Sequence, residues 1–204
     1  MTPPPYESLS ITTRISKSLS DLIRAHIPLL QASDSSVRFE SPAELDGTDE
    51  AQLSMYLYQI EINPFLRNLP ETIIPVAGSG GLASLQSIPA PLVVDLLYMM
   101  VPIVKSPEYE MWIADGLVRL LDTCGTIPEQ YLDQTLKETG NDCLQIIPDF
   151  TSIHTLRDLW AAFPQKAYRL TKLYRVSPVR LFSGPGRPVD VVAEVDVTVT
   201  REAG

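Results

Sequence analysis

The chain has 204 residues, of which 45% are hydrophobic and 20% charged, and a formal net charge of -9 at pH 7. That apolar content supports one buried core and excludes a disordered chain. The acidic balance, without a run of Lys or Arg, argues against binding of nucleic acid or an anionic membrane surface, because neutralising phosphates supplies most of that affinity. The two cysteines lack metal-ligand spacing and predict a reduced protein assembled in the cytoplasm.

Neither a targeting segment nor a membrane-spanning segment is expected. The N-terminus is rich in proline and has no basic segment followed by an apolar one. The most apolar run, residues 91–104, is interrupted by Asp95 and two prolines and is too short to cross a bilayer. It suits a buried strand.

The first segments predicted along the chain are a Pro-rich lead over residues 1–9 and an amphipathic helix over residues 10–27. Apolar side chains recur along this helix at the spacing of a single face: Ile11, Ile15, Leu19, Leu22, Ile23 and Ile27. Pro28 follows where the helix has to end, because proline cannot continue it. Residues 37–39 predict a short strand.

Two long strands are predicted next, over residues 53–62 and 91–104, because both are rich in branched and aromatic side chains. Asn63-Pro64 ends the first strand, since proline cannot donate to a ladder. The two strands are expected to pair antiparallel. Residues 65–88 between them show no regular period and contain Gly78-Ser79-Gly80-Gly81, so they predict an irregular loop.

Helices and strands follow one another in the second half of the chain. Ser106-Pro107-Glu108 predicts the start of a helix that Gly125 ends, and residues 128–138 predict a short one. Residues 143–147 predict a strand closed by Pro148. A helix capped by Thr151 or Ser152 and stopped by Pro164 is expected to turn one set of side chains inward: Ile153, Leu156, Leu159, Trp160 and Phe163.

Residues 167–182 predict another long strand. One face carries Leu170, Lys172, Tyr174 and Val176, and the other carries Thr171, Leu173, Arg175 and Ser177. The element order predicts an α+β fold. We expect a mostly antiparallel sheet of about four to five strands, flanked by three or four helices and followed by a C-terminal strand arm.

The last residues predict a hinge and then a strand. Residues 183–188, Ser-Gly-Pro-Gly-Arg-Pro, are the hinge. Beyond it small apolar side chains stand at every second position: Val189, Val191, Ala193, Val195, Val197 and Val199. Two alternatives stay open, an edge strand of the chain's own sheet or a strand added to a neighbour's sheet. The expected division is a lead over 1–9, one domain over 10–182 and the arm over 183–204.

Catalytic, cofactor and metal sites are not indicated by the residues. His26 and His154 are expected to be surface or capping histidines, and a nucleophile–base pair of Cys124 or Cys143 with His154 is disfavoured because free cysteines are usually small buried apolar groups. Gly78-Ser79-Gly80-Gly81 lacks the lysine of a phosphate-binding loop. Three acidic neighbours lack the alternation of a calcium loop: Asp46, Asp49 and Glu50. We therefore expect a protein that is not an enzyme and binds no cofactor or metal.

Four segments, in order, resemble the Pvc16 N-terminal domain family, which contains cap proteins of contractile injection systems. They are Leu57-Tyr58-Gln59-Ile60-Glu61-Ile62-Asn63-Pro64-Phe65-Leu66-Arg67-Asn68, then Pro91 to Pro102, then Leu144-Gln145-Ile146-Ile147-Pro148 with Leu159-Trp160, and Tyr168-Arg169-Leu170 with Tyr174 to Val179. The likeness covers residues 10–182. Residues 68–90 and 183–204 lie outside it.

The resemblance implies a tail-terminator-like fold and a six-fold ring. Such a ring sits on the end of the inner tube and the last sheath ring, stops their growth and holds the sheath extended. The implied partners are further copies of the chain, sheath protein and tube protein. Apolar and aromatic anchors with arginine are the usual energetic centres of such contacts. The candidate interface residues are Tyr58, Phe65, Arg67, Tyr174, Arg175, Val189, Val191, Val195, Val197 and Val199.

Other functions are weighed against this one. A small-molecule or peptide binding module, or an unrecognised hydrolase, would use residues 68–90 as a lid, since long loops in compact domains are often functional. The same domain could also terminate a true phage tail or a membrane-anchored system. For the arm, pairing with a sheath subunit by strand addition is the first expectation, to be tested by deleting residues 184–204.

Overall fold

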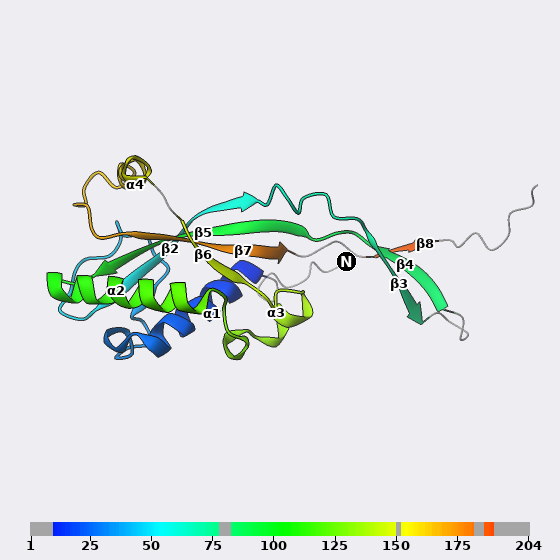
Figure 1. The fold of residues 1–204 in the computed structure, drawn as a ribbon, viewed down its shortest axis with the longest axis horizontal. Coiled ribbons are helices and arrows are strands. Elements are labelled where there is room, and N and C mark those ends of the chain that lie inside the picture. The colour runs from blue at the N-terminus through cyan, green and yellow to red at the C-terminus, as the bar shows by residue number, and fades with distance from the viewer. Residues whose placement is uncertain (1–9, 78–82, 150–151, 182–185, 190–204) are drawn as a thin grey trace, which may run out of the picture. The chain divides into compact units, whose positions relative to one another are not determined.

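Two sheets organise the chain, each in its own unit. The computed structural model describes residues 10–77, 83–149, 152–181 and 186–189. The main unit comprises Met1–Arg67 and Leu92–Phe182, and the hairpin unit comprises Asn68–Pro91 and Ser183–Gly204. The main sheet has the strand order β1-β2-β5-β7-β6 and the small sheet the order β3-β4-β8 (Figure 1).

The main unit contains these elements: α1 Ile11–His26, a 3-10 turn Pro28–Leu30, β1 Val37–Arg38, β2 Gln52–Ile62, β5 Leu92–Ile103, α2 Pro107–Cys124, a 3-10 turn Glu129–Tyr131, α3 Gln134–Glu138, β6 Gln145–Pro148, α4 Ile153–Trp160 and β7 Lys172–Leu181. The hairpin unit contains β3 Thr72–Ala77, β4 Ala83–Ile88 and β8 Arg187–Val189. The α+β class, the mostly antiparallel main sheet and the antiparallel pairing of β2 with β5 are confirmed.

The helices α1 and α2 begin at the residues that the sequence predicts, and α2 also ends where predicted. Ser10 accepts a hydrogen bond from the Thr13 amide at the start of α1, and Ser106 accepts one from the Tyr109 amide at the start of α2. Gly125 ends α2 with φ of 57°, a left-handed conformation that glycine adopts without a Cβ penalty. These local signals fix where each helix meets the sheet.

Helices cover both faces of the main sheet. On one face α1, α2 and α3 pack over the larger core, and on the other α4 packs over a smaller one (Figure 1). The middle strand β5 is buried from Val93 to Ile103 because its side chains enter both cores in turn. The larger core takes Val94, Leu96, Tyr98 and Met100, and the smaller core takes Met99, Val101 and Ile103.

One buried hydrogen bond ties α1 to the middle of the sheet. The Tyr98 hydroxyl and the Ser16 Oγ lie 2.8 Å apart, and Tyr98 is fully buried in the larger core. Burial raises the pKa of Tyr98 to about 12, while the Ser16 bond acts in the opposite direction. The neutral phenol is therefore strongly favoured in the folded protein.

This pKa predicts a loss of stability in alkali. Below the pKa of about 10 of an unfolded tyrosine, both states keep the proton. Above it only the unfolded state ionises, so the free energy of unfolding falls by up to about 1.4 kcal/mol per pH unit until the folded pKa is reached. We expect urea unfolding followed by circular dichroism between pH 9 and 11.5 to show a loss of stability to which Tyr98 contributes this slope, and Tyr98→Phe to make the loss less steep. Equal slopes in both proteins would contradict the assignment.

The structure corrects the expectation of an irregular segment at 65–88. Thr72–Ala77 and Ala83–Ile88 are the strands β3 and β4, paired antiparallel in a hairpin. Pro75 and the nearby glycines hide the strand pattern in the sequence. Proline is tolerated in β3 because that strand lies at the edge of the small sheet, where an N–H can be lost without breaking a ladder. The lid hypothesis thereby loses its only basis, a long irregular loop.

Smaller corrections concern the ends of elements. Residues 128–138 form a 3-10 turn and a separate helix α3, which Asp133 caps. β7 begins at Lys172, because the preceding chain bonds elsewhere: the Leu170 amide donates to Glu110 Oε1 at 3.0 Å. The helix α4 ends at Trp160 instead of Phe163. Ile153 was expected to face inward and is 65% exposed.

The C-terminal strand begins inside the predicted hinge. Arg187–Val189 is β8, and it pairs antiparallel with β4 of the same chain. Of the period-two segment, only Val189 falls within the described residues; Val191, Val195, Val197 and Val199 lie outside them, as does the lead over residues 1–9. Residues 187–189 of the arm therefore belong to the chain's own small sheet.

Candidate interaction site

The main sheet carries a buried polar cluster, here called the Asp95 junction, where β2 ends beside β5 and β7. The Asp95 Oδ1 accepts hydrogen bonds from Ser177 Oγ at 2.6 Å and from Asn63 Nδ2 at 2.9 Å. Arg175 Nη1 lies 3.4 Å from the Asp95 Oδ2. Asp95, Asn63 and Ser177 are all buried. The cluster satisfies the buried carboxylate of β5 with groups from β7 and from the residue that follows β2, as such a carboxylate requires.

The same junction shapes the turn that follows β2. Asn63 Oδ1 accepts hydrogen bonds from the Phe65 and Leu66 amides, each at 3.1 Å. The Asn63 amide donates to the Val93 carbonyl at 3.0 Å and closes the ladder between β2 and β5. Phe65 projects from this turn with 91% of its surface exposed. A large aromatic side chain is thus held out in solvent by a rigid backbone, which suits a contact with another molecule.

The predicted interface residues lie in four different settings. Phe65 and Arg67 are exposed on the turn after β2. Tyr58 is half-buried on β2 against the smaller core, and Arg175 lies on that same face of the sheet, in the Asp95 junction. Tyr174 is buried on the opposite face, in the larger core. Val189 is half-buried in β8 of the hairpin unit.

Two of these residues are tyrosines with altered acidity. Burial first, and then the Asp149 and Glu61 carboxylates, raise the pKa of Tyr58 to about 12, while Arg175 opposes the rise. Burial and the Asp122 carboxylate raise the pKa of Tyr174 to about 12. Both phenols are therefore neutral at physiological pH and serve as packing or hydrogen-bonding groups.

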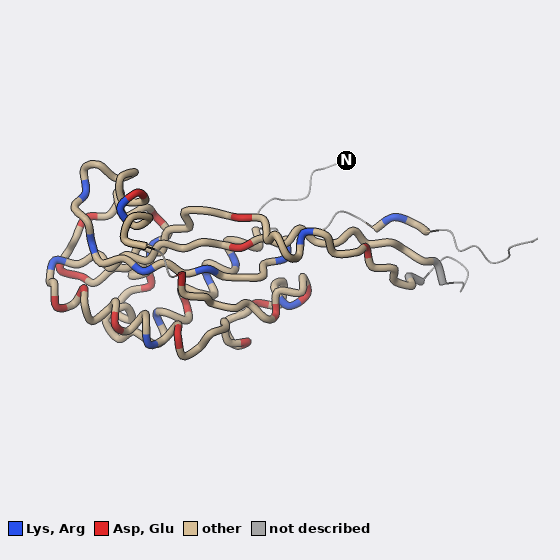
Figure 2. Tube along the Cα trace, turned by 45° about the horizontal axis from the view of Figure 1, so that its top comes forward, with Lys and Arg blue, Asp and Glu red and all other residues tan. Residues whose placement is uncertain are grey.

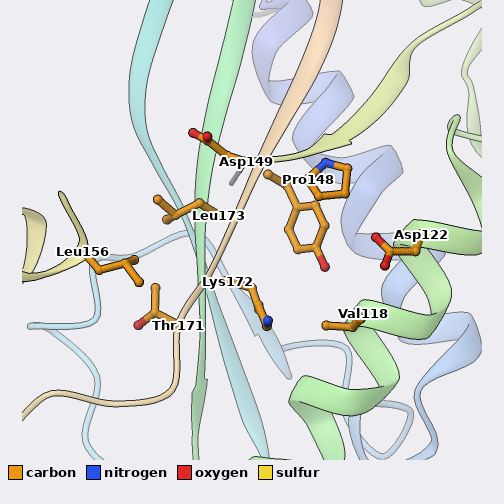
Figure 3. A pocket seen from close by; sticks show the side chains of 9 residues that line it. Val118, Asp122, Pro148, Asp149, Leu156, Thr171, Lys172 and Leu173 are labelled. Carbon is orange, nitrogen blue, oxygen red and sulfur yellow. The ribbon is translucent and has the colours of Figure 1, made fainter. Parts of the chain in front are cut away.

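A hollow of about 290 Å³ lies beside β7 where β6 ends. Its lining comes from α2, the end of β6 and β7, with Leu156 of α4 at the margin (Figure 3). Asp122, Asp149 and Lys172 contribute charge to it. Within the described residues these groups form no ion pair with one another, and no group of three or more metal-ligating side chains is found there.

The histidines and cysteines do not assemble as a nucleophile and base in the described ranges. His154 is exposed on α4 and lines a hollow to which neither cysteine contributes. Cys143 is exposed, and Cys124 is half-buried at the end of α2. Cys124 shares a hollow of about 480 Å³ with His26, whose Nδ1 lies 2.9 Å from the Leu22 carbonyl.

A second candidate interaction feature is the outer edge of β2. The strand β1 pairs with β2 only through Leu53 and Ser54. From Met55 to Ile62, no strand within the described ranges pairs with that edge. Ile60 and Ile62 are each 51% exposed beside it. Open edges of this kind are sites for strand addition unless something covers them.

Sequence reasoning missed the Asp95 junction and the open edge. A signal for the first was present, because Asp95 interrupts an otherwise apolar strand, but its partners come from residues 32 and 82 positions away. The edge depends on how short β1 is, which no local pattern shows. Charge gives no further guide: Lys and Arg are interspersed with Asp and Glu along the described chain (Figure 2).

The fold is that of terminator proteins of contractile injection systems. A solved structure described as the PVC sheath/tube terminator of an extracellular contractile injection system, in its extended state, matches with a TM-score of 0.67 at 20% identity, over 96% of this chain and 65% of that one. The tube-terminating cap of the anti-feeding prophage matches with a TM-score of 0.62 at 18% identity, over 91% of this chain and 60% of that one.

The chain belongs to the Pvc16 N-terminal domain family, whose model matches residues 14–193. It spans less than two thirds of the length of the two solved chains. No curated protein matches it. Among the described helices, none has the length and apolar character needed to cross a bilayer.

Proposed function

We propose that this chain is the core of a cap, or tail terminator, of a contractile injection particle. In this role it forms a ring, six-fold as the family resemblance implies, that ends the growth of tube and sheath and holds the sheath extended. Its partners are copies of itself, sheath protein and tube protein, and it acts without catalysis. The particle assembles in the cytoplasm. The observation that carries the proposal is the terminator fold over 96% of the chain.

Features of the main unit support a role in assembly. A ring needs head-to-tail contacts that close on themselves, so each subunit must present two different surfaces. The turn with Phe65 and the adjoining open edge of β2 supply exposed groups for one of these surfaces. Exposed apolar side chains at both places would be buried in a ring, which removes the cost of leaving them in water.

The test is to delete the gene for this chain from a strain that makes the particle, and to image the purified particles by electron microscopy. We expect tubes and sheaths of variable length, or sheaths that have already contracted, and a missing density at one end. Expression of the chain from a plasmid should restore uniform extended particles, with a ring at the end after image averaging. Particles of normal length and normal ends in the deletion strain would overturn the proposal.

A further inference from the structure

The period-two segment at the C-terminus extends beyond the strand with which it begins to pair. In the small sheet Arg187 lies opposite Ser87 and Val189 opposite Leu85. Continued in the same register, residues 190 and 191 would face Ser84 and Ala83, and Ala83 is the first residue of β4. The alternation of small apolar and polar residues continues to Val199. In this register β4, which begins at Ala83, offers no residue opposite positions 192–199.

Within the hairpin unit, β8 runs in the direction opposite to β4. Asn68 and Pro91, at the base of the hairpin, join the hairpin unit to the main unit. Because β8 runs antiparallel to β4, it leads from the base of the hairpin toward the connection between β3 and β4. Residues 190–199 contain no Gly, Pro or Asn, which most turns use. Asp190 and Asp196 are their only common turn formers, and the alternation favours a continued strand.

The main unit offers an acceptor of matching length and character. The unpaired outer edge of β2, Met55 to Ile62, is as long as the segment 192–199. Ile60 pairs with Leu96 and Ile62 with Val94, so both isoleucines lie on the face of the larger core, yet half of each remains exposed. A strand with valine at every second position would cover them, as cross-strand apolar pairs do.

We propose that residues 192–199 of one copy add as a strand to the outer edge of β2 in a second copy. Each copy then donates one strand and accepts another, which is a head-to-tail contact able to close a ring. The backbone hydrogen bonds of the edge supply affinity, and the valines supply specificity. The pairing deepens the proposed ring and rests on that function only in requiring that copies of this chain meet.

Charge selects the register. Glu61 lies between Ile60 and Ile62 on the opposite face, and like charges directly across a pair of strands are destabilising. The register that sets Thr198, rather than Asp196, beside Glu61 avoids this repulsion. In a parallel strand this register lays residues 192–199 along Met55 to Ile62, with Val197 beside Ile60 and Val199 beside Ile62. An antiparallel strand in this register would run past the end of β2.

Disulfide trapping between purified copies tests the proposal. Both native cysteines are first replaced, Cys124→Ser and Cys143→Ser. A tagged copy with Ile60→Cys is mixed with an untagged copy that carries Val197→Cys, Val199→Cys or, as the matched control, Thr198→Cys. After mild oxidation we expect one of the two valine variants to give several-fold more mixed disulfide than Thr198→Cys, since residue 198 points to the other face.

Two further measurements make the outcome of this experiment decisive. Ile62→Cys replaces Ile60→Cys as acceptor, and thermal melts establish that each variant is folded. Equal trapping at residue 198, absence of mixed disulfide with both acceptors, or disulfides that form only within one doubly substituted chain would each overturn the proposal. Trapping of the donor on sheath protein in purified particles, in place of Ile60, would do so as well. If particles are capped normally but no mixed disulfide forms between copies, only the strand exchange is refuted. If the mixed disulfide forms but particles are not capped, only the terminator role is refuted.

Discussion

Replacing Asp95 by alanine is expected to lower the free energy of unfolding by about 2–4 kcal/mol, because Asn63 and Ser177 then stay buried without their acceptor. Arg175 adds less to the loss, since its side chain is 37% exposed and water can replace the carboxylate. Chemical denaturation of the purified chain measures the effect. The same variant should loosen the turn after β2, because Asn63 also accepts from the Phe65 and Leu66 amides.

Two variants separate the role of charge from the role of hydrogen bonding at this junction. Asp95→Asn keeps an oxygen that accepts from Ser177 and Asn63 but loses the charge that faces Arg175, so a smaller loss of about 1 kcal/mol is expected. Asp122→Ala removes an exposed carboxylate elsewhere in the main unit and should change stability by less than about 0.5 kcal/mol. If Asp95→Ala were as stable as Asp122→Ala, the junction would not brace the sheet.

Replacing Phe65 by alanine is expected to weaken assembly strongly while leaving the folded subunit intact. With 91% of its surface exposed, the side chain contributes little to the core, so the free energy of unfolding should change by less than about 0.5 kcal/mol. If the ring or its partners bury Phe65 as an anchor, its loss costs at least about 2 kcal/mol of contact energy, roughly a 30-fold weaker association. Quantitative binding of the purified chain to sheath, tube and itself measures this.

A control on the same turn distinguishes an anchor from a general surface effect. Arg67→Ala changes an exposed residue two positions away and removes charge instead of apolar area. We expect it to reduce the rate of association and its salt dependence more than the lifetime of the complex. Full occupancy of particle ends by Phe65→Ala, at the concentration that saturates the unchanged chain, would exclude this residue from the interface.

The helices and the long strands of the main unit could be predicted because their signals are local. The apolar stripe from Ile11 to Ile27 predicts a single helix. Ser10 marks its start and Pro28 its end. The alternation along β7 likewise predicts that Tyr174 and Arg175 face opposite sides of the sheet, which the two cores confirm. Burial on both faces made β5 recognisable as a continuous apolar run.

What could not be predicted depends on contacts between distant residues. A sequence pattern shows that Asp95 is unusual in its strand, but not that Asn63 and Ser177 meet it. The strands β3 and β4 escaped because Pro75 and a glycine-rich connection are the ordinary marks of a loop. Whether an edge such as that of β2 is open is decided by the length of its neighbour β1, which only the register reveals.

The bond from the Asn63 amide to the Val93 carbonyl has a consequence for how this fold can vary. It completes the β2–β5 ladder next to the Asp95 junction, before the chain enters the hairpin unit at Asn68 and after it returns at Pro91. The ladder between β2 and β5 is thus closed by residues of the main unit itself. Because the cost of closing a loop grows only slowly with its length, the inserted hairpin can lengthen or shorten among relatives with little effect on the sheet that carries it. Selection on the length of the hairpin and selection on the stability of the main unit can therefore act independently.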